Sequence, residues 1–140
     1  MAVMKKFMFL FLVCIIILGG CSGTKGPSTK NEESAGYMKI SSKEAHTMMT
    51  VLANCIVLDV RTIEEYDDLH IKDALLIPVN EITERAEKEI PDKRTVILVH
   101  CRRGNRSVTA AAELVRLGYV NVYEFGGIND WPYETIKGNY

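Results

Sequence analysis

Short apolar runs alternate with amphipathic segments through most of this chain of 140 residues. Two of the runs, Cys55–Val60 and Thr95–Val99, are rich in β-branched residues and almost wholly apolar, which is typical of strands buried on both faces of a parallel sheet. Strands that alternate with helices through short connections predict an α/β domain with a central, mostly parallel sheet and helices on both faces. The other runs expected to form strands are Tyr37–Ile40, Leu75–Ile77 and Asn121–Phe125.

The segments between these strands carry signals for helix starts and stops. Ser107–Leu117 has apolar residues at helical spacing, and Gly118 after it is a typical stop. Asn80 stands where it can cap a helix that ends near Glu89. Two further helices are expected to begin with capping boxes, formed by Ser41 with Glu44 and by Thr62 with Glu65.

The connection that follows the Thr95–Val99 strand concentrates reactive and charged residues. Cys101 lies where the buried strand ends and a helix soon begins, so unpaired backbone N–H groups and the helix dipole favour its thiolate. Gly104 allows the chain to turn so that several N–H groups point inward and cradle an anion. Positive charge comes from Arg102, Arg103 and Arg106. We therefore predict a nucleophilic cysteine that meets an anionic substrate, and we expect the arginines to lower its pKa.

The first 36 residues differ in composition from the rest. A basic start is followed by the uncharged apolar stretch Phe7–Leu18, which is too short to span a hydrocarbon core of about 30 Å comfortably and is typical of a secretory signal. Leu18–Cys21 (Leu-Gly-Gly-Cys) resembles the lipobox of bacterial lipoproteins. This resemblance implies a signal peptide over residues 1–20 and a lipid on Cys21. Export and membrane anchoring on the outer or periplasmic side would follow. Residues 21–36 are expected to form a flexible tether, and residues 37–140 the folded domain.

The cysteines and the overall charge exclude some classes of function. With Cys14 in the leader and Cys21 lipidated, Cys55 and Cys101 remain, and the chain has no C-x-x-C pair or Cys/His cluster. We therefore expect no metal site, and we expect Cys55 to be a free structural thiol. The chain has 17 basic and 18 acidic residues and no long basic run, which does not favour nucleic acid as a partner.

Three separated motifs in the folded part resemble those of the single-domain rhodaneses, a family of sulfurtransferases. The motifs are Leu58–Arg61 with Glu64–Tyr66, His70–Ile71, Ala74 and Ile77–Pro78; Cys101–Ser107; and Gly126–Ile128 with Trp131. Leu69 departs from the family, which often has glycine there, but it lies in a turn away from the Cys101 segment. The resemblance implies a rhodanese-like three-layer α/β fold with about five mostly parallel strands. We expect a monomer without a cofactor.

The resemblance also implies a reaction. The Cys101 thiolate would take a sulfane sulfur from a donor such as thiosulfate, hold it as a persulfide, and pass it to cyanide or a thiol. The substrate-binding residues would be Arg102, Arg103, Gly104, Asn105, Arg106 and Ser107. Arg106 is expected on the inner wall of the site and Arg103 to point outward.

Residues beyond this segment are expected to play supporting roles. Asp59 and Arg61 end a neighbouring strand and are candidates for contacts that support the site. The segment Glu64–Tyr66 is expected to form a packed helix face with an ion pair to Arg61. His100 precedes the cysteine, but adjacent strand residues point to opposite faces, so we do not expect it to act as a general base.

Two alternatives stay open at this point. Phosphatases of the cell-cycle dual-specificity type share the fold, but their loop has five residues between Cys and Arg, whereas four separate Cys101 from Arg106. The smaller loop suits a sulfur atom better than a tetrahedral phosphate or arsenate group. A rhodanese-like module can also bind a partner without catalysis, and the presence of Cys101 argues against this.

Overall fold

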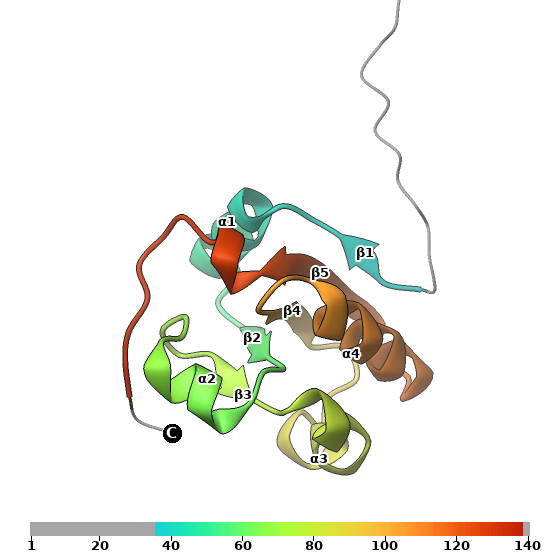
Figure 1. Cartoon of the computed structure of the whole chain (residues 1–140). Helices are drawn as coiled ribbons and strands as arrows, with labels where there is room; N and C mark the ends of the chain where they lie inside the picture. The colour runs from blue at the N-terminus through green and yellow to red at the C-terminus, as the bar shows by residue number, and fades with distance from the viewer. Residues whose placement is uncertain (1–35, 139–140) are drawn as a thin grey trace, which may run out of the picture. The chain divides into compact units, whose positions relative to one another are not determined.

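The computed structural model describes residues 36–138. Within this range a sheet of five parallel strands has the order β1-β5-β4-β2-β3 (Figure 1). The strands are β1 (Met38–Lys39), β2 (Cys55–Asp59), β3 (Leu75–Leu76), β4 (Val96–Cys101) and β5 (Asn121–Gly127). The predicted α/β class and the central parallel sheet are confirmed. β4 lies in the middle of the sheet, so the chain after its last residue starts from the most buried strand.

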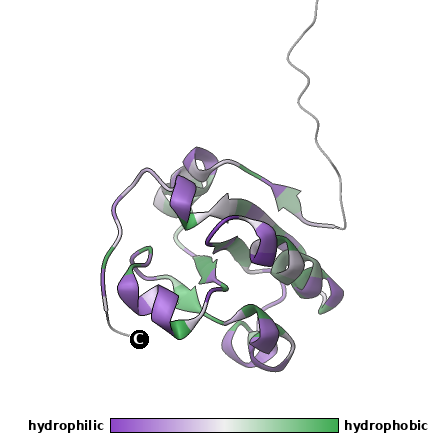
Figure 2. Cartoon of the chain, in the orientation of Figure 1, coloured by the Kyte–Doolittle hydropathy of each residue, from purple (hydrophilic) through white to green (hydrophobic). Residues whose placement is uncertain are grey.

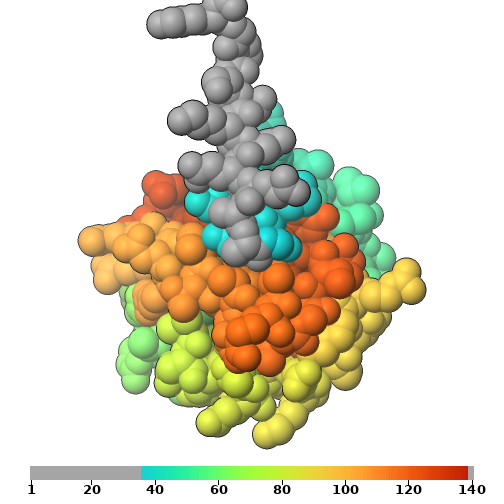
Figure 3. Space-filling view, turned by 90° about the vertical axis from the view of Figure 1, so that its right-hand side faces the viewer, coloured from blue at the N-terminus to red at the C-terminus, as the bar shows by residue number. Residues whose placement is uncertain are grey.

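Helices cover both faces of this sheet. They are α1 (Ser42–Val51), α2 (Ile63–Asp68), α3 (Ile82–Glu89) and α4 (Asn105–Arg116), with short 3₁₀ turns η1 (Val79–Glu81) and η2 (Ile128–Asp130). α3 and α4 pack on one face with Leu58, Val99 and Val122, whereas α1, α2 and η2 pack on the other face with Leu98 and Phe125. Figure 2 shows the resulting pattern, with apolar β2 and β3 and largely polar α2 and α3. In Figure 3 the orange atoms of α4 lie beside the yellow-green atoms of η1 and α3.

Both predicted capping boxes are present. The Ser41 hydroxyl accepts from the Glu44 N–H at 3.2 Å while the Ser41 N–H donates to the Glu44 carboxylate at 2.7 Å, and Thr62 and Glu65 repeat the arrangement at the start of α2. The prediction that Asn80 caps a helix is wrong, because Asn80 lies within η1 and α3 begins after Glu81 without a side-chain cap. The Glu81 N–H donates to the Pro78 carbonyl at 2.8 Å, so the backbone turn itself provides an acceptor there.

Several predictions concern residues that the structure does not describe. The signal peptide over residues 1–20, the lipid on Cys21 and the tether over residues 21–36 lie outside the described residues, Gly36 excepted, and they stay predictions. Among the helices of residues 36–138, none has the length and apolar character needed to cross a membrane.

Candidate active site

Cys101 is the last residue of β4 and lies at the base of the site. Strand alternation directs Ile97, Val99 and Cys101 toward α3 and α4, and it directs His100 to the opposite face, where its ring lies 5.1 Å from that of Phe125. The predicted separation of His100 from the cysteine side chain is therefore confirmed. Cys101 is 1 % exposed. Because so little of it is exposed, a reagent can reach its sulfur only from the pocket above it.

The loop after β4 brings backbone donors around this sulfur. Gly104 has a φ of 94°, which a residue with a side chain rarely adopts, and its N–H donates to Cys101 Sγ at 3.1 Å. Gly104 also stands as the N-cap of α4, which therefore begins at Asn105, two residues earlier than predicted. The turn that the sequence predicted at this glycine is confirmed.

The pKa of Cys101 reflects two opposing influences. Burial raises the pKa of the thiol, while hydrogen bonds from the Ser107 hydroxyl and from the N–H groups of Ser107, Arg103 and Gly104 lower it, and the net shift is downward. The hydrogen bonds make the largest lowering contributions, whereas burial of the thiol acts in the opposite direction. The cradle of donors thus favours the thiolate from within the loop.

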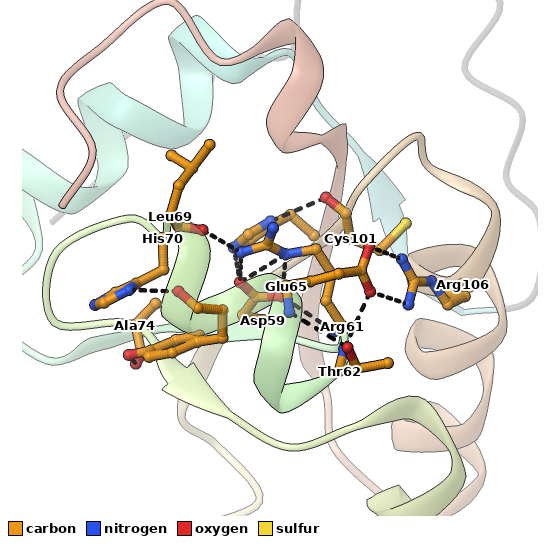
Figure 4. Close-up of polar contacts among 11 residues, drawn as sticks. Asp59, Arg61, Thr62, Glu65, Leu69, His70, Ala74, Cys101 and Arg106 are labelled. Atoms are coloured by element: carbon orange, nitrogen blue, oxygen red, sulfur yellow. Dashed lines mark hydrogen bonds and ion pairs between the residues drawn. The ribbon is translucent and has the colours of Figure 1, made fainter. Parts of the chain in front are cut away.

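Arg106 is held by a carboxylate from another helix. Its guanidinium donates two hydrogen bonds to Glu65, Nη1 to Oε2 at 2.6 Å and Nη2 to Oε1 at 2.8 Å (Figure 4). The hydrogen bonds from Arg106 hold the pKa of Glu65 at about 2. Glu65 also caps the start of α2 through the Thr62 N–H, so one carboxylate ties α2 to α4 across the site. The expected ion pair between the Glu64–Tyr66 helix face and Arg61 is wrong, because Arg61 has a different carboxylate partner.

That partner is Asp59, at the end of β2. Arg61 donates from Nη2 to Asp59 Oδ2 at 2.7 Å and to the Leu69 carbonyl at 2.7 Å, and both charged residues are buried (Figure 4). His100 Nε2 lies 3.6 Å from Asp59 Oδ2. Among residues 36–138, neither Asp59 nor Arg61 hydrogen-bonds the Cys101–Ser107 loop. Their hydrogen bonds join the end of β2 to the chain after α2, and they act on the site only by holding these two segments together.

An open pocket of about 350 Å³ lies above the cysteine. Its walls are formed by Glu65, Cys101, Arg102, Arg103, Asn105 and Arg106. Arg102 and Arg103 are exposed, and neither forms an ion pair with another described residue. Arg103, expected to point outward, is exposed and also lines the pocket. Three arginines against one carboxylate give the pocket the charge that attracts a small anion.

Two residues of β5 complete the site from below. A Cβ on Gly127 would lie 2.3 Å from the Arg102 carbonyl oxygen, so only glycine allows the loop to lie on this strand. Glu124 is 5 % exposed, and its Oε1 accepts from the Ser107 hydroxyl at 2.6 Å and from the Gly126 N–H at 2.8 Å. Glu124 was not among the site residues predicted from the sequence. Alternation contained the signal, because Glu124 follows buried Val122 by two residues.

The arrangement is that of a known class of protein. The model of the rhodanese-like domain family matches residues 41–133, well over half of the chain. This chain belongs to that family.

Relatives with named activities agree with the family. Thiosulfate sulfurtransferase PspE of Escherichia coli (strain K12) is 36% identical over 81 residues, which cover 58% of this chain and 78% of that protein. Thiosulfate sulfurtransferase GlpE of Coxiella burnetii is 33% identical over 96 residues, covering 68% and 87%. A solved rhodanese with anions from E. coli is 35% identical with a TM-score of 0.56, over 59% of this chain and 98% of that one. The BH2092 protein of Bacillus halodurans is 30% identical with a TM-score of 0.64, over 73% and 77%.

Proposed function

We propose that this protein is a rhodanese-type sulfurtransferase that carries a sulfane sulfur on Cys101. The donor is thiosulfate or a similarly small anion, and the acceptor is cyanide or a thiol. The observation that carries the proposal is the contact of Cys101 Sγ with the Gly104 N–H at 3.1 Å, at the base of a pocket lined by arginines. The two relatives that are named thiosulfate sulfurtransferases support the choice of donor.

In the first step the Cys101 thiolate attacks the outer sulfur of the donor. A new S–S bond forms to Cys101 Sγ, the S–S bond within thiosulfate breaks, and sulfite leaves with the electron pair. Arg102 and Arg103 attract the dianion from the exposed wall of the pocket. The leaving sulfite departs through the same opening, and the persulfide remains.

In the second step an acceptor attacks the terminal sulfur of the persulfide. The bond between the two sulfurs breaks, and Cys101 leaves as a thiolate. The N–H groups of Arg103, Gly104 and Ser107 stabilise negative charge on the sulfur at both ends of the cycle, as an oxyanion hole stabilises oxygen. Because the same donors favour the thiolate and the persulfide, the enzyme needs no separate general base in the pocket.

Formation of thiocyanate from thiosulfate and cyanide tests this function. The full-length protein is expected to turn over. Cys101→Ser is expected to be inactive, and Cys55→Ser, which removes the other described thiol, is the matched control and is expected to keep its activity. Folded protein that transfers no sulfur from thiosulfate or polysulfide would indicate a binding module instead. Turnover of p-nitrophenyl phosphate that exceeds turnover of thiosulfate would indicate a phosphatase.

A further inference from the structure

A buried carboxylate lies directly beneath the cysteine loop, and the proposed reaction does not use it. Glu124 comes from β5 and is 5 % exposed, and Ser107 in the first turn of α4 is fully buried. Glu124 Oε1 accepts two hydrogen bonds, from the Ser107 hydroxyl at 2.6 Å and from the Gly126 N–H at 2.8 Å. The negative charge of a buried carboxylate in this position raises the free energy of any anion that forms nearby.

The hydroxyl of Ser107 has more acceptors than it can serve. A serine hydroxyl carries one hydrogen. In this structure the Ser107 oxygen lies within hydrogen-bonding distance of Glu124 Oε1 at 2.6 Å, the Gly104 carbonyl at 2.9 Å and the Gly126 carbonyl at 3.3 Å. Gly104, whose carbonyl the Ser107 hydroxyl contacts, donates its own N–H to Cys101 Sγ at 3.1 Å, so the hydroxyl lies in the shell of donors around the sulfur, and it lowers the pKa of Cys101. The single hydroxyl hydrogen of Ser107 can therefore form a strong hydrogen bond to the Glu124 carboxylate or to the Cys101 sulfur, but not to both at once.

We propose that Glu124 is a positioning residue that competes with Cys101 for the single hydroxyl hydrogen of Ser107 and so restrains ionisation of the thiol. A hydrogen bond to an ionised acceptor is about twice as strong as one between neutral groups. The carboxylate therefore holds the hydrogen while Cys101 is a thiol. When the thiolate forms, the hydroxyl must turn toward sulfur and leave Glu124 with the Gly126 N–H alone.

This competition has a chemical purpose. Backbone donors and the start of α4 lower the pKa of Cys101, and a thiolate loses nucleophilicity as its pKa falls, so the best attacking thiol has a pKa near the ambient pH. Glu124 opposes the lowering and keeps the sulfur reactive. The charged groups that face Cys101 from the surrounding elements are Glu65 on α2, Arg102 and Arg103 in the loop, Arg106 on α4 and Glu124 on β5. Of these, Glu124 alone reaches Ser107.

The inference rests on the proposed function only in taking Cys101 as the reacting thiol, and its test needs no sulfur transfer. The rate of alkylation of Cys101 by iodoacetamide is measured against pH in the full-length chain, with the Cys101 peptide quantified by mass spectrometry. Glu124→Gln keeps the shape and an acceptor oxygen but removes the charge. We expect the apparent pKa of Cys101 to fall by about one unit, so that the thiolate fraction well below the pKa rises about tenfold.

Further variants separate the proposed route from simpler ones. Ser107→Ala is expected to raise the pKa of Cys101, and Glu124→Gln added to it is expected to have much less effect than in the wild-type chain. Glu113→Gln, on the same helix as Ser107 but beyond the loop, is the matched control and is expected to change nothing. If Glu124→Gln does not fold, Glu124→Asp replaces it, because the shorter side chain withdraws from the Ser107 hydroxyl and is expected to lower the pKa as well.

Three results would overturn the inference. An unchanged pKa in Glu124→Gln would mean that the carboxylate only orders the loop. A raised pKa would mean that Glu124 accepts the thiol proton, and an equal shift with and without Ser107 would mean that its charge acts directly on the sulfur. Failure of thiocyanate formation would count against the proposed reaction and leave this measurement unaffected.

Discussion

Replacing Gly127 by alanine tests whether the loop must lie directly on β5. The added Cβ would lie 2.3 Å from the Arg102 carbonyl oxygen, 2.6 Å from its carbonyl carbon and 2.7 Å from Arg103 Cα. Ordinary contacts begin at 3.4 Å, so the loop backbone must move by about 1 Å. None of these atoms belongs to a flexible side chain, and the loop follows the strand end at Cys101 without a spacer. The displacement therefore falls on the cradle itself.

The expected consequences of Gly127→Ala follow from that displacement. A shift of about 1 Å in a catalytic group can cost about a hundredfold in rate, so we expect sulfur transfer to fall by that order. The Gly104 N–H, now 3.1 Å from Cys101 Sγ, would lose its hydrogen bond, and the pKa of the thiol is expected to rise. Overpacking is expected to cost about 1–3 kcal/mol of unfolding free energy. Stopped-flow turnover and urea denaturation measure the two effects.

Gly118→Ala is the matched control for this variant. Gly118 has a φ of 93° and no atom within 4 Å of an added Cβ, so its replacement strains the backbone at the end of α4 without moving the loop. We expect a loss of about 1–2 kcal/mol in stability with an unchanged rate of sulfur transfer. If Gly127→Ala transferred sulfur at the wild-type rate, the argument that the loop and β5 define the cradle together would be refuted.

Two further predictions concern the groups around the site. Since the hydrogen bonds from Arg106 hold the pKa of Glu65 at about 2, below the ordinary value of 4.5, their pair stabilises the fold above about pH 4.5, and this stabilisation is lost as the pH falls toward 2. Glu65→Gln is therefore expected to be less stable by about 1 kcal/mol at pH 7 and equal to wild type near pH 2, and a constant difference in urea denaturation across this range would contradict the assignment. His100→Asn is expected to keep the rate and the pH profile of sulfur transfer while losing about 1–2 kcal/mol of stability, because His100 is buried on the face opposite Cys101. If the dependence of the sulfur-transfer rate on pH lost its rising or its falling part in His100→Asn, His100 would be acting as a general base.

The fold was predictable from local pattern to a considerable extent. The runs around Val57 and Leu98 are apolar because both faces of the sheet are covered, and the capping boxes at Ser41 and Thr62 form because their partners are three residues away. The start of α4 was less predictable, because the backbone of Gly104 rather than a side chain ends the loop. Asn80 failed as a cap because a backbone turn at Pro78 competes with it.

The site was easiest to predict where its residues are neighbours in sequence. Cys101 and Gly104 could be assigned from the loop alone, because strand, turn and helix follow one another there. The pairing of Arg106 with Glu65 joins residues 41 positions apart and depends on how α2 and α4 pack across the sheet. Glu124 shows the opposite case, since alternation with Val122 already placed it on the covered face of β5 and a buried carboxylate needs donors such as Ser107.

The mass of the Cys101 peptide after exposure to thiosulfate tests the central claim most directly. The full-length chain is incubated with thiosulfate without an acceptor, digested, and analysed by mass spectrometry under non-reducing conditions. We predict that the Cys101 peptide gains the mass of one sulfur atom, that the Cys55 peptide does not, and that cyanide removes the added sulfur. A Cys101 peptide of unchanged mass after treatment with both thiosulfate and polysulfide would contradict the account.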